Sequence, residues 1–221
     1  MNIIVSQEIE SVCPQFVGAC VEAVVVNTPH SRGLWREIDA LGEHYRALLT
    51  TETLKQMPGI AATRRVYRAC GKDPSRYRPA SEALIRRLLQ GKPLYRIDTL
   101  VDLVNLASMR FGYSIGGFDA DKLEGGTLTL GIGRAGEPYE GIGRGMLNIE
   151  GLPVYRDARG GVGTSTSDNE RTKIELPTTR LLVLINGYDG DEASVRANAE
   201  YILRLAERYC EGKEGKYFIY R

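Results

Sequence analysis

The amino-acid sequence predicts an α+β fold, in which a helical N-terminal half packs on a mainly antiparallel sheet. Two observations support this class. Apolar residues recur at three- and four-residue steps in several segments between residues 31 and 111, as on one face of a helix. From residue 114 to 183 the chain changes to short alternating runs separated by glycines, as in strands and tight turns. Because helices come mostly first and strands mostly second, alternating βαβ units are not expected.

Each predicted element has its own local signal. Strands are expected at 3–5 and 17–26, where β-branched and small apolar residues dominate. Ser31 is a suitable N-cap for a helix that runs to Tyr45, and Asp98 or Thr99 for one that ends at Phe111. The remaining expected elements are a helix at 63–69, a helix from Pro79 in its first turn to Gly91, a helix at 191–209 and a strand at 217–220.

A length of 221 residues is typical of one domain or of two tightly joined ones, and we expect a single soluble domain over residues 1–221. Hydrophobic residues make up 43% and charged residues 26%, close to globular averages. The N-terminus lacks a secretory signal and no apolar run approaches the roughly 20 residues of a membrane span, so a cytoplasmic protein without membrane contact is expected.

Four scattered cysteines and two histidines offer no metal-ligand spacing, so no metal is expected. Two GIGR sequences, at 131–134 and 141–144, match neither nucleotide-binding motif, and no cofactor is expected.

Basic residues cluster between Arg64 and Lys92, where nine lysines and arginines stand against Asp73 and Glu82. A local cluster of this kind is the electrostatic signature of nucleic-acid binding. The residues expected to contact RNA phosphates are Arg64, Arg65, Arg68, Arg86 and Arg87. The alternative is a solvated helical face that only keeps the helices soluble.

Three groups of residues could form a ligand pocket. Asn105 is an amide within an apolar helix, where it either binds a ligand or ties down neighbouring backbone. Gly116 and Gly117 allow close approach to a ligand, with Asp119 capping or orienting the next residues, or they mark a kinked strand. The third group lies in the loop 160–172, which is either a ligand-binding loop or an ordinary polar turn: Thr164, Ser165, Thr166, Asp168 and Arg171, the last as an anion-binding side chain.

Two stretches carry a resemblance to a known family. Val101-Asp102-Leu103-Val104-Asn105 and the run from Gly116 to Gly126 resemble the tRNA-binding and editing (B3/B4) domain of the phenylalanyl-tRNA synthetase beta subunit. The resemblance implies that Asn105 lines an editing pocket, that the 160–172 loop binds ligand, and that Glu175 stands near the family's hydroxyl-testing glutamate. It also implies a departure, because the family carries a histidine where Gly116 stands.

The resemblance therefore implies a freestanding domain that binds tRNA, without DNA specificity, and hydrolyses mischarged aminoacyl-tRNA in trans. Nothing corresponds to the module that activates phenylalanine, so a complete synthetase is not expected. An aminoacyl ester is already activated, and a positioned water with oxyanion donors can suffice for its hydrolysis. No catalytic residue is assigned. The alternatives are a protein that binds a small amino-acid-like ligand without RNA, and a hydrolase that uses His30 or a hydroxyl of residues 164–167.

Overall fold

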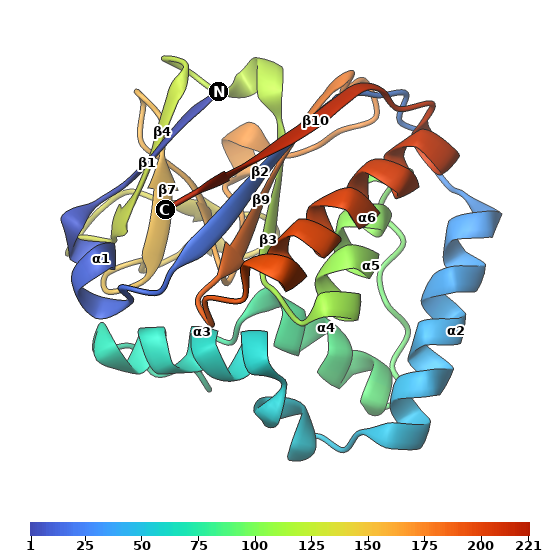
Figure 1. Ribbon diagram of the computed structural model, residues 1–221, viewed down its shortest axis with the longest axis horizontal. Helices are drawn as coiled ribbons and strands as arrows, with labels where there is room; N and C mark the ends of the chain where they lie inside the picture. Colours follow the sequence, from blue (N-terminus) through green and yellow to red (C-terminus); the bar gives the residue numbers. More distant parts are fainter.

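The computed structural model describes all 221 residues as two four-stranded sheets and a two-stranded ribbon, with six α-helices around them (Figure 1). The helices are α1 Gln7–Val12, α2 Arg32–Leu48, α3 Pro58–Ala69, α4 Ala80–Leu89, α5 Thr99–Phe111 and α6 Glu192–Cys210. The strands are β1 Asn2–Val5, β2 Val17–Val24, β3 Ile115–Asp119, β4 Thr127–Ile132, β5 Glu140–Gly141, β6 Gly145–Met146, β7 Pro153–Arg156, β8 Gly161–Thr164, β9 Arg180–Gly187 and β10 Lys213–Tyr220. The predicted α+β class is confirmed.

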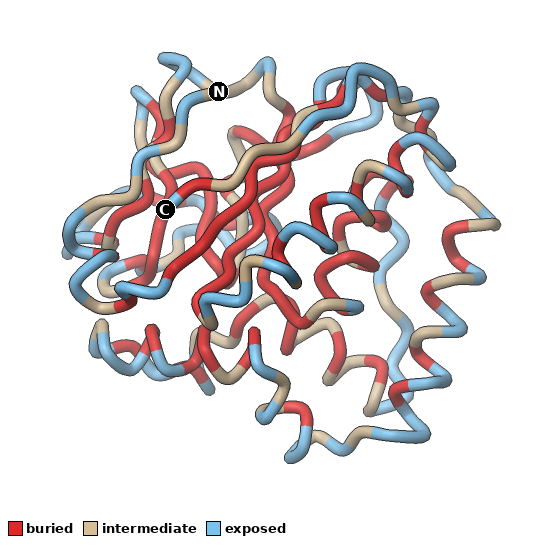
Figure 2. Tube along the Cα trace, in the orientation of Figure 1, coloured by how far each residue is buried: buried red, intermediate tan, exposed pale blue.

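The central sheet has the strand order β10-β2-β9-β3 and is antiparallel throughout. Side chains alternate between its two faces, so β2 sends Ala19 and Val21 to one side and Cys20 to the other. The first face carries the larger core, which is formed with apolar residues of α2, α4, α5 and α6. Figure 2 shows β2, β9 and β3 buried along most of their length, whereas the edge strand β10 is mostly exposed or half-buried. The sheet is therefore covered by helices on one side.

The second sheet, β1-β4-β7-β8, covers the opposite face of the central sheet. Its pairs are antiparallel except for β1 with β4, which run parallel. Leu128 and Leu130 of β4 pack with Leu182 and Leu184 of β9 in a second core. The resulting order of layers is helices, central sheet, second sheet. The loops at the β3 end of the central sheet are consequently close to those that follow β8.

Local signals account for most helix starts. The Ser31 hydroxyl accepts a hydrogen bond from Leu34 N, Asp98 accepts from Val101 N, and Asp191 accepts from Ser194 N, as N-caps do. Helix α3 begins at Pro58, five residues before the predicted start. Pro79 precedes α4 as its N-cap residue instead of lying in the first turn.

Two elements differ more from the prediction, for physical reasons. Helix α1 is absent from the predicted elements; it has six residues, buries only Ile9, and its N-cap Ser6 makes no side-chain capping bond. Strand β10 begins at Lys213, four residues before the predicted strand. It lies at the edge of the central sheet, and its first half is exposed and polar and contains a register shift. Neither segment has an apolar pattern in the sequence.

The basic cluster of residues 64–92 is organised around one buried carboxylate. Glu82 of α4 is 1% exposed, and its Oε2 lies 2.8 Å from Nη1 of Arg64, which is itself buried. Arg78 and Arg86 approach the other carboxylate oxygen at 3.7 and 3.8 Å. This ion pair joins α3 to α4. Arg64 is therefore committed inside the protein and is not on the surface that it was expected to share with the other arginines.

The other four predicted RNA contacts differ in exposure. Arg65 and Arg68 of α3 are exposed. Arg86 and Arg87, expected to point outward, are half-buried. Arg86 donates to the Thr51 carbonyl at 3.0 Å, and Arg87 donates to the Pro93 carbonyl at 2.5 Å and stacks on Tyr95.

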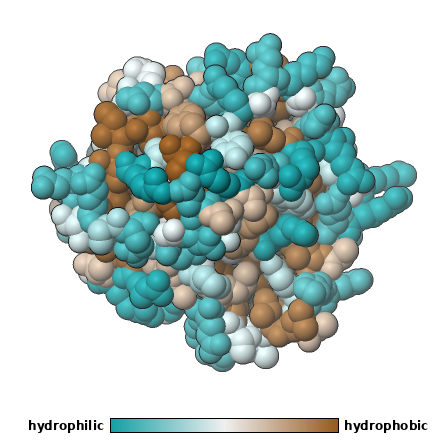
Figure 3. Space-filling view, viewed as in Figure 1, coloured by the Kyte–Doolittle hydropathy of each residue, from teal (hydrophilic) through white to brown (hydrophobic).

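On the face drawn in Figure 3, hydrophilic residues predominate and apolar residues occur in separate groups. No helix combines the length and the hydropathy that crossing a bilayer requires.

We predict that Glu82→Ala destabilises the protein by about 3–5 kcal/mol, because it leaves the Arg64 guanidinium buried without its counter-charge. Urea denaturation at neutral pH measures this loss. The matched control is Glu43→Ala, since Glu43 is an exposed helical glutamate of α2 and its replacement should change stability by no more than about 0.5 kcal/mol. A loss below about 1 kcal/mol for Glu82→Ala would contradict the structural role given to this pair.

Candidate functional site

The largest hollow of the molecule is a pocket of about 650 Å³ between α5, β3 and the chain that follows β8. A volume of this size suits a small organic ligand. Apolar side chains form much of the wall, and a few polar groups interrupt them. Its lining consists of Ala80, Ile97, Asp98, Val101, Val104, Asn105, Ile115, Gly117, Ile142, Thr164, Ser167, Asp168, Lys173, Ile174, Glu175, Leu176 and Pro177.

Asn105 presents an amide to this pocket. Helix α5 places it there because Val101, Val104 and Asn105 are three and four residues apart and share one helix face. The residue is half-buried, and its amide makes no hydrogen bond within the chain. Asn105 thus has free donors and a free acceptor inside a largely apolar wall.

Asp168 presents a carboxylate to the same pocket. Its Oδ2 accepts a hydrogen bond from the Gly117 backbone N–H at 3.0 Å, which connects the loop after β8 to strand β3. Burial raises the pKa of Asp168 to about 7, and the Gly117 hydrogen bond only partly opposes this effect. A carboxyl group with this pKa can accept and return a proton near neutral pH.

Two glycines make room for Asp168 and for the ring of Phe118. A Cβ atom on Gly116 would lie 2.7 Å from Cζ of Phe118 and 3.2 Å from Oδ1 of Asp168. A Cβ atom on Gly163 would lie 2.6 Å and 2.9 Å from the same two atoms. Gly116 is not part of the pocket lining, whereas Gly117 is. The position where the resemblance places a histidine is therefore filled by a phenylalanine ring packed between the sheets.

Three buried tyrosines hold the loop that carries Asp168. The Tyr188 hydroxyl lies 3.2 Å from Oγ of Ser165, and the Tyr67 hydroxyl lies 2.8 Å from Oγ1 of Thr166. The third, Tyr139, donates to the carbonyl of Ser167 at 2.7 Å. Ser165 and Thr166 were predicted to bind ligand, but both are buried and face these tyrosines instead of the pocket. Their role in the structure is to position the loop.

The two hydroxyls that do line the pocket donate their protons within the loop. Thr164 Oγ1 donates to the Ser167 carbonyl at 2.9 Å. Ser167 Oγ donates to the Asp168 carbonyl at 3.3 Å. Thr164 Oγ1 also accepts from the backbone N–H groups of Thr166 and Ser167 at 3.2 and 3.1 Å, so its hydrogen-bonding capacity is used within the loop. Each hydroxyl has one proton, so the Ser167 hydroxyl faces the pocket mainly as an acceptor.

Three further predicted residues are bound to other parts of the protein. Arg171, expected to bind an anion, donates to Oδ1 of Asp157 at 2.8 Å and to the Lys122 carbonyl, and does not line the pocket. Asp119 is buried and accepts from the Thr178 hydroxyl at 2.9 Å, also outside the lining. Glu175 lies at the pocket and pairs with Lys122 at 2.5 Å.

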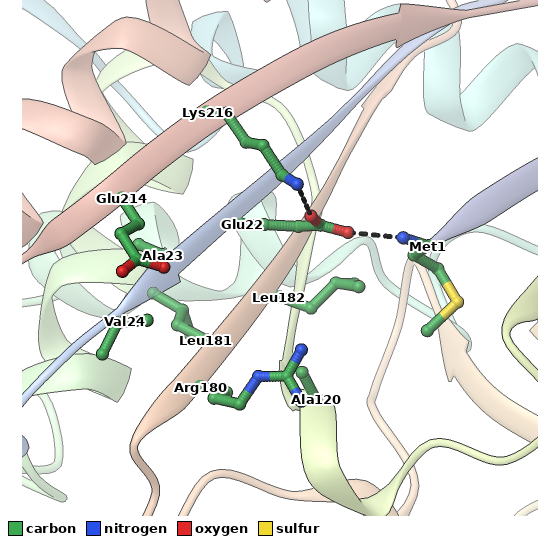
Figure 4. Close-up of a pocket in the computed structure, with 10 residues that line it drawn as sticks. All are labelled: Met1, Glu22, Ala23, Val24, Ala120, Arg180, Leu181, Leu182, Glu214 and Lys216. Carbon is green, nitrogen blue, oxygen red and sulfur yellow. Dashed lines mark hydrogen bonds and ion pairs between the residues drawn. The ribbon is translucent and has the colours of Figure 1, made fainter.

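A second hollow, shown in Figure 4, lies at the β10–β2–β9 edge and measures about 170 Å³. It contains Glu22, whose Oε1 lies 2.7 Å from the Met1 ammonium and whose Oε2 lies 3.1 Å from Nζ of Lys216. These two cations lower the pKa of Glu22 despite its partial burial. Glu22 is thus satisfied within the chain, so this hollow offers less for a ligand than the larger pocket.

The structure brings together five of the ten residues predicted for the pocket: Asn105, Gly117, Thr164, Asp168 and Glu175. His30 is exposed and lies outside the lining. Sequence reasoning missed the wall formed by Ile97, Ile142, Ile174 and Leu176, because isolated apolar residues in loops carry no periodic signal. The supporting tyrosines were also missed, since their partners are far away in the sequence.

Comparison with known proteins shows similarity to beta subunits of phenylalanyl-tRNA synthetase. The family described as B3/4 domain matches residues 62–210. The phenylalanine–tRNA ligase beta subunit of Geobacter metallireducens is 30% identical over 107 residues, which are 48% of this chain and 13% of that subunit. An N-terminal fragment of the phenylalanyl-tRNA synthetase beta subunit from Pyrococcus horikoshii superposes with a TM-score of 0.51 at 12% identity, over 98% of this chain and 50% of that fragment. At 12% identity, the similarity to the Pyrococcus horikoshii fragment shows a shared fold and nothing more.

We predict that Asp168→Asn stabilises the protein at pH 8 by about 1–3 kcal/mol. The pKa of Asp168 is about 7 in the folded protein, above the value near 4 of an unfolded chain. The folded state therefore holds a proton that the unfolded state releases, and wild-type stability falls as pH rises from about 4 to 7. Asparagine carries no charge and still offers an oxygen to Gly117 N–H.

Urea denaturation at pH 5, 6.5 and 8 measures this effect, with the exposed Asp39→Asn as the matched control. The difference between Asp168→Asn and wild type should shrink towards pH 5. A difference that is the same at all three pH values would rule out a raised pKa at Asp168.

We also predict that Gly116→Ala costs about 1–3 kcal/mol, because its methyl group would overlap the buried Phe118 ring. The neighbouring Gly117→Ala should cost less, since its methyl group would meet only the ends of the Ile174 and Val104 side chains at 3.2 and 3.3 Å. Thermal unfolding compares the two variants. The packing described at Gly116 would be wrong if Gly117→Ala were the more damaging change.

Proposed function

Since the chain belongs to the B3/4 domain family, we propose that it binds the 3′ end of an aminoacyl-tRNA and hydrolyses the ester of a mischarged amino acid in trans. The matched region is 13% of the length of the related ligase subunit. We therefore do not propose the complete ligase activity for this chain. The observation that carries the proposal is that Asp168 and the free amide of Asn105 both line one largely apolar pocket.

Asp168 is the proposed general base. An aminoacyl ester is activated, so its hydrolysis requires a water molecule that loses a proton as it attacks the carbonyl carbon. The Asp168 carboxylate accepts that proton, and the carbonyl carbon gains a hydroxyl group. The bond from carbon to the ribose oxygen then breaks, and the proton passes to the ribose oxygen, which leaves as a hydroxyl. With a pKa of about 7, Asp168 is suited to both transfers at neutral pH.

Asn105 and the apolar wall of the pocket can stabilise the developing negative charge and hold the amino-acid side chain. The Asn105 amide can donate a hydrogen bond to the carbonyl oxygen, where negative charge develops during attack. Val101, Val104 and Ile174 can enclose an apolar amino-acid side chain. The backbone N–H of Gly117 is occupied by Asp168 and therefore orients the base.

A second candidate is binding of a small amino-acid-like ligand without RNA. It is favoured by the placement of the arginines, because of the five expected to contact RNA only Arg65 and Arg68 are exposed. Under this alternative the pocket is the same, but tRNA neither binds nor loses its amino acid.

The test is incubation of the protein with correctly charged and mischarged tRNAs, with release of labelled amino acid as the readout. We expect release from a mischarged species and little from the matched one. The rate should rise with pH through about 7, as Asp168 loses its proton. Asp168→Asn should lower the rate about 10²–10⁴-fold, whereas the matched Asp39→Asn should leave it unchanged.

Binding of uncharged tRNA, measured at increasing salt, separates the two candidates. RNA contact through arginines predicts an affinity that falls steeply with salt. No tRNA binding and no deacylation, together with thermal stabilisation by an amino-acid-like ligand, would favour the second candidate. Full activity of Asp168→Asn would refute the role of general base.

A further inference from the structure

A third hollow of the molecule lies among α2, α5 and α6, in the layer of helices shown in Figure 1, and measures about 370 Å³. A volume of this size is enough for a small organic ligand. The hollow shares no lining residue with the larger pocket, although α5 contributes to both. We call it the three-helix groove. Leu41 and Leu106 give it an apolar part, and its polar groups belong to Glu37, His44, Arg110 and Tyr201.

The guanidinium group of Arg110 is the free charge of the three-helix groove. Arg110 is exposed, and its side chain forms no ion pair and no hydrogen bond with the chain. It lies over the ring of Tyr201, with its Cζ 5.1 Å from the ring centroid. A guanidinium stacked in this way keeps its N–H donors along its edge, where they can bind an oxyanion with two parallel hydrogen bonds.

A second guanidinium group increases the positive charge around Tyr201. Arg204 of α6 lies over the same ring, with its Cζ 5.8 Å from the centroid. Its only ion pair is with Glu200 at 4.0 Å, and because both side chains are exposed this pair neutralises little of the charge. Asp39 and Glu43, the other acidic residues of α2, are exposed and lie outside the lining. An anion beside the Tyr201 ring is therefore attracted by two cations.

Glu37 is the one acidic residue of the lining, and its carboxylate is already bound within the chain. Its Oε1 accepts hydrogen bonds from the Tyr209 hydroxyl at 2.5 Å and from Nη1 of Arg208 at 3.0 Å. Its Oε2 accepts from the Tyr201 hydroxyl at 3.3 Å. Arg208 thus balances the charge of Glu37, and the hydrogen bond from Tyr201 holds the ring on which Arg110 stacks. Glu37 does not serve as the counter-charge of Arg110.

From these contacts we propose that the three-helix groove binds a small organic anion, in which a carboxylate or phosphate group is joined to an apolar body. The anionic group pairs with Arg110 and has the His44 imidazole as a second donor. The apolar body lies against Leu41 and Leu106. This site is separate from the pocket of the proposed function, so neither proposal depends on the other.

The experiment titrates the full chain with phenyl phosphate and with phenylacetate, which share an apolar ring and differ in their anionic group. Phenylacetamide lacks the charge and inorganic phosphate lacks the apolar body, so these two are the comparison compounds. Titration calorimetry gives the affinities. We expect at least one of the aromatic anions to bind roughly tenfold or more tightly than both comparison compounds, and the preferred one tells whether the groove takes a phosphate or a carboxylate.

Arg110→Met removes the guanidinium and keeps an unbranched side chain, so it should weaken binding of the preferred anion roughly tenfold. The matched control is Arg68→Met, since Arg68 is an exposed arginine of α3 outside the groove and its replacement should leave the affinity unchanged. Asn105→Ala, a change in the larger pocket, should also leave it unchanged.

Three results would overturn the inference: no binding of either aromatic anion, equal binding of phenylacetamide, or full affinity in Arg110→Met. Loss of binding in Asn105→Ala with none in Arg110→Met would assign the anion to the larger pocket and would overturn it as well. Release of amino acid from tRNA tests the proposed function alone, because no residue of the three-helix groove takes part in that reaction.

Discussion

The close approach of strand β3 to the loop after β8 is the constraint on which the pocket depends. Gly116 and Gly163 leave no space for a Cβ atom there, and the ring of Phe118 and the carboxylate of Asp168 occupy that space together. The Gly117 N–H then binds Asp168 at 3.0 Å. Because β3 belongs to the central sheet and β8 to the second, this contact joins the two sheets at the point where the pocket opens. A larger residue at either glycine would separate the parts that form the site.

Local chemistry explains which features the sequence predicted well. The caps at Ser31, Asp98 and Asp191 act on donors three residues away, so they can be recognised without knowledge of the fold. Asn105 was recognisable for a related reason, since an amide on an apolar helix face needs a partner, and here the chain provides none. Asp168 was predicted as a pocket residue, but its raised pKa arises from burial, which depends on the assembled sheets.

Long-range partners explain which features the sequence could not reveal. Arg64 and Arg171 appear as surface cations in the sequence, yet Glu82 and Asp157 bind them, 18 and 14 residues away. Ser165 and Thr166 appear as ligand donors, yet Tyr188 and Tyr67 bind their hydroxyls. In each case the side chain has the predicted chemistry and a different partner. Charge and hydroxyl counts along a sequence therefore overstate the groups that a folded site has available.

Hydrogen bonds from three buried tyrosines make one wall of the pocket, the loop that carries Asp168, more rigid than the rest. The loop that carries Asp168 is tied by Tyr67, Tyr139 and Tyr188, which come from three separate parts of the chain, so it moves only if several buried contacts break together. The segment 91–97, which contributes Ile97 to the pocket lining, is mostly exposed and irregular, and it is attached through a few contacts such as Arg96 on Trp35. Local opening concentrates where buried contacts are few. We therefore expect the Asp168 loop to keep its position and the exposed segment that ends at Ile97 to adjust to the shape of a bound ligand.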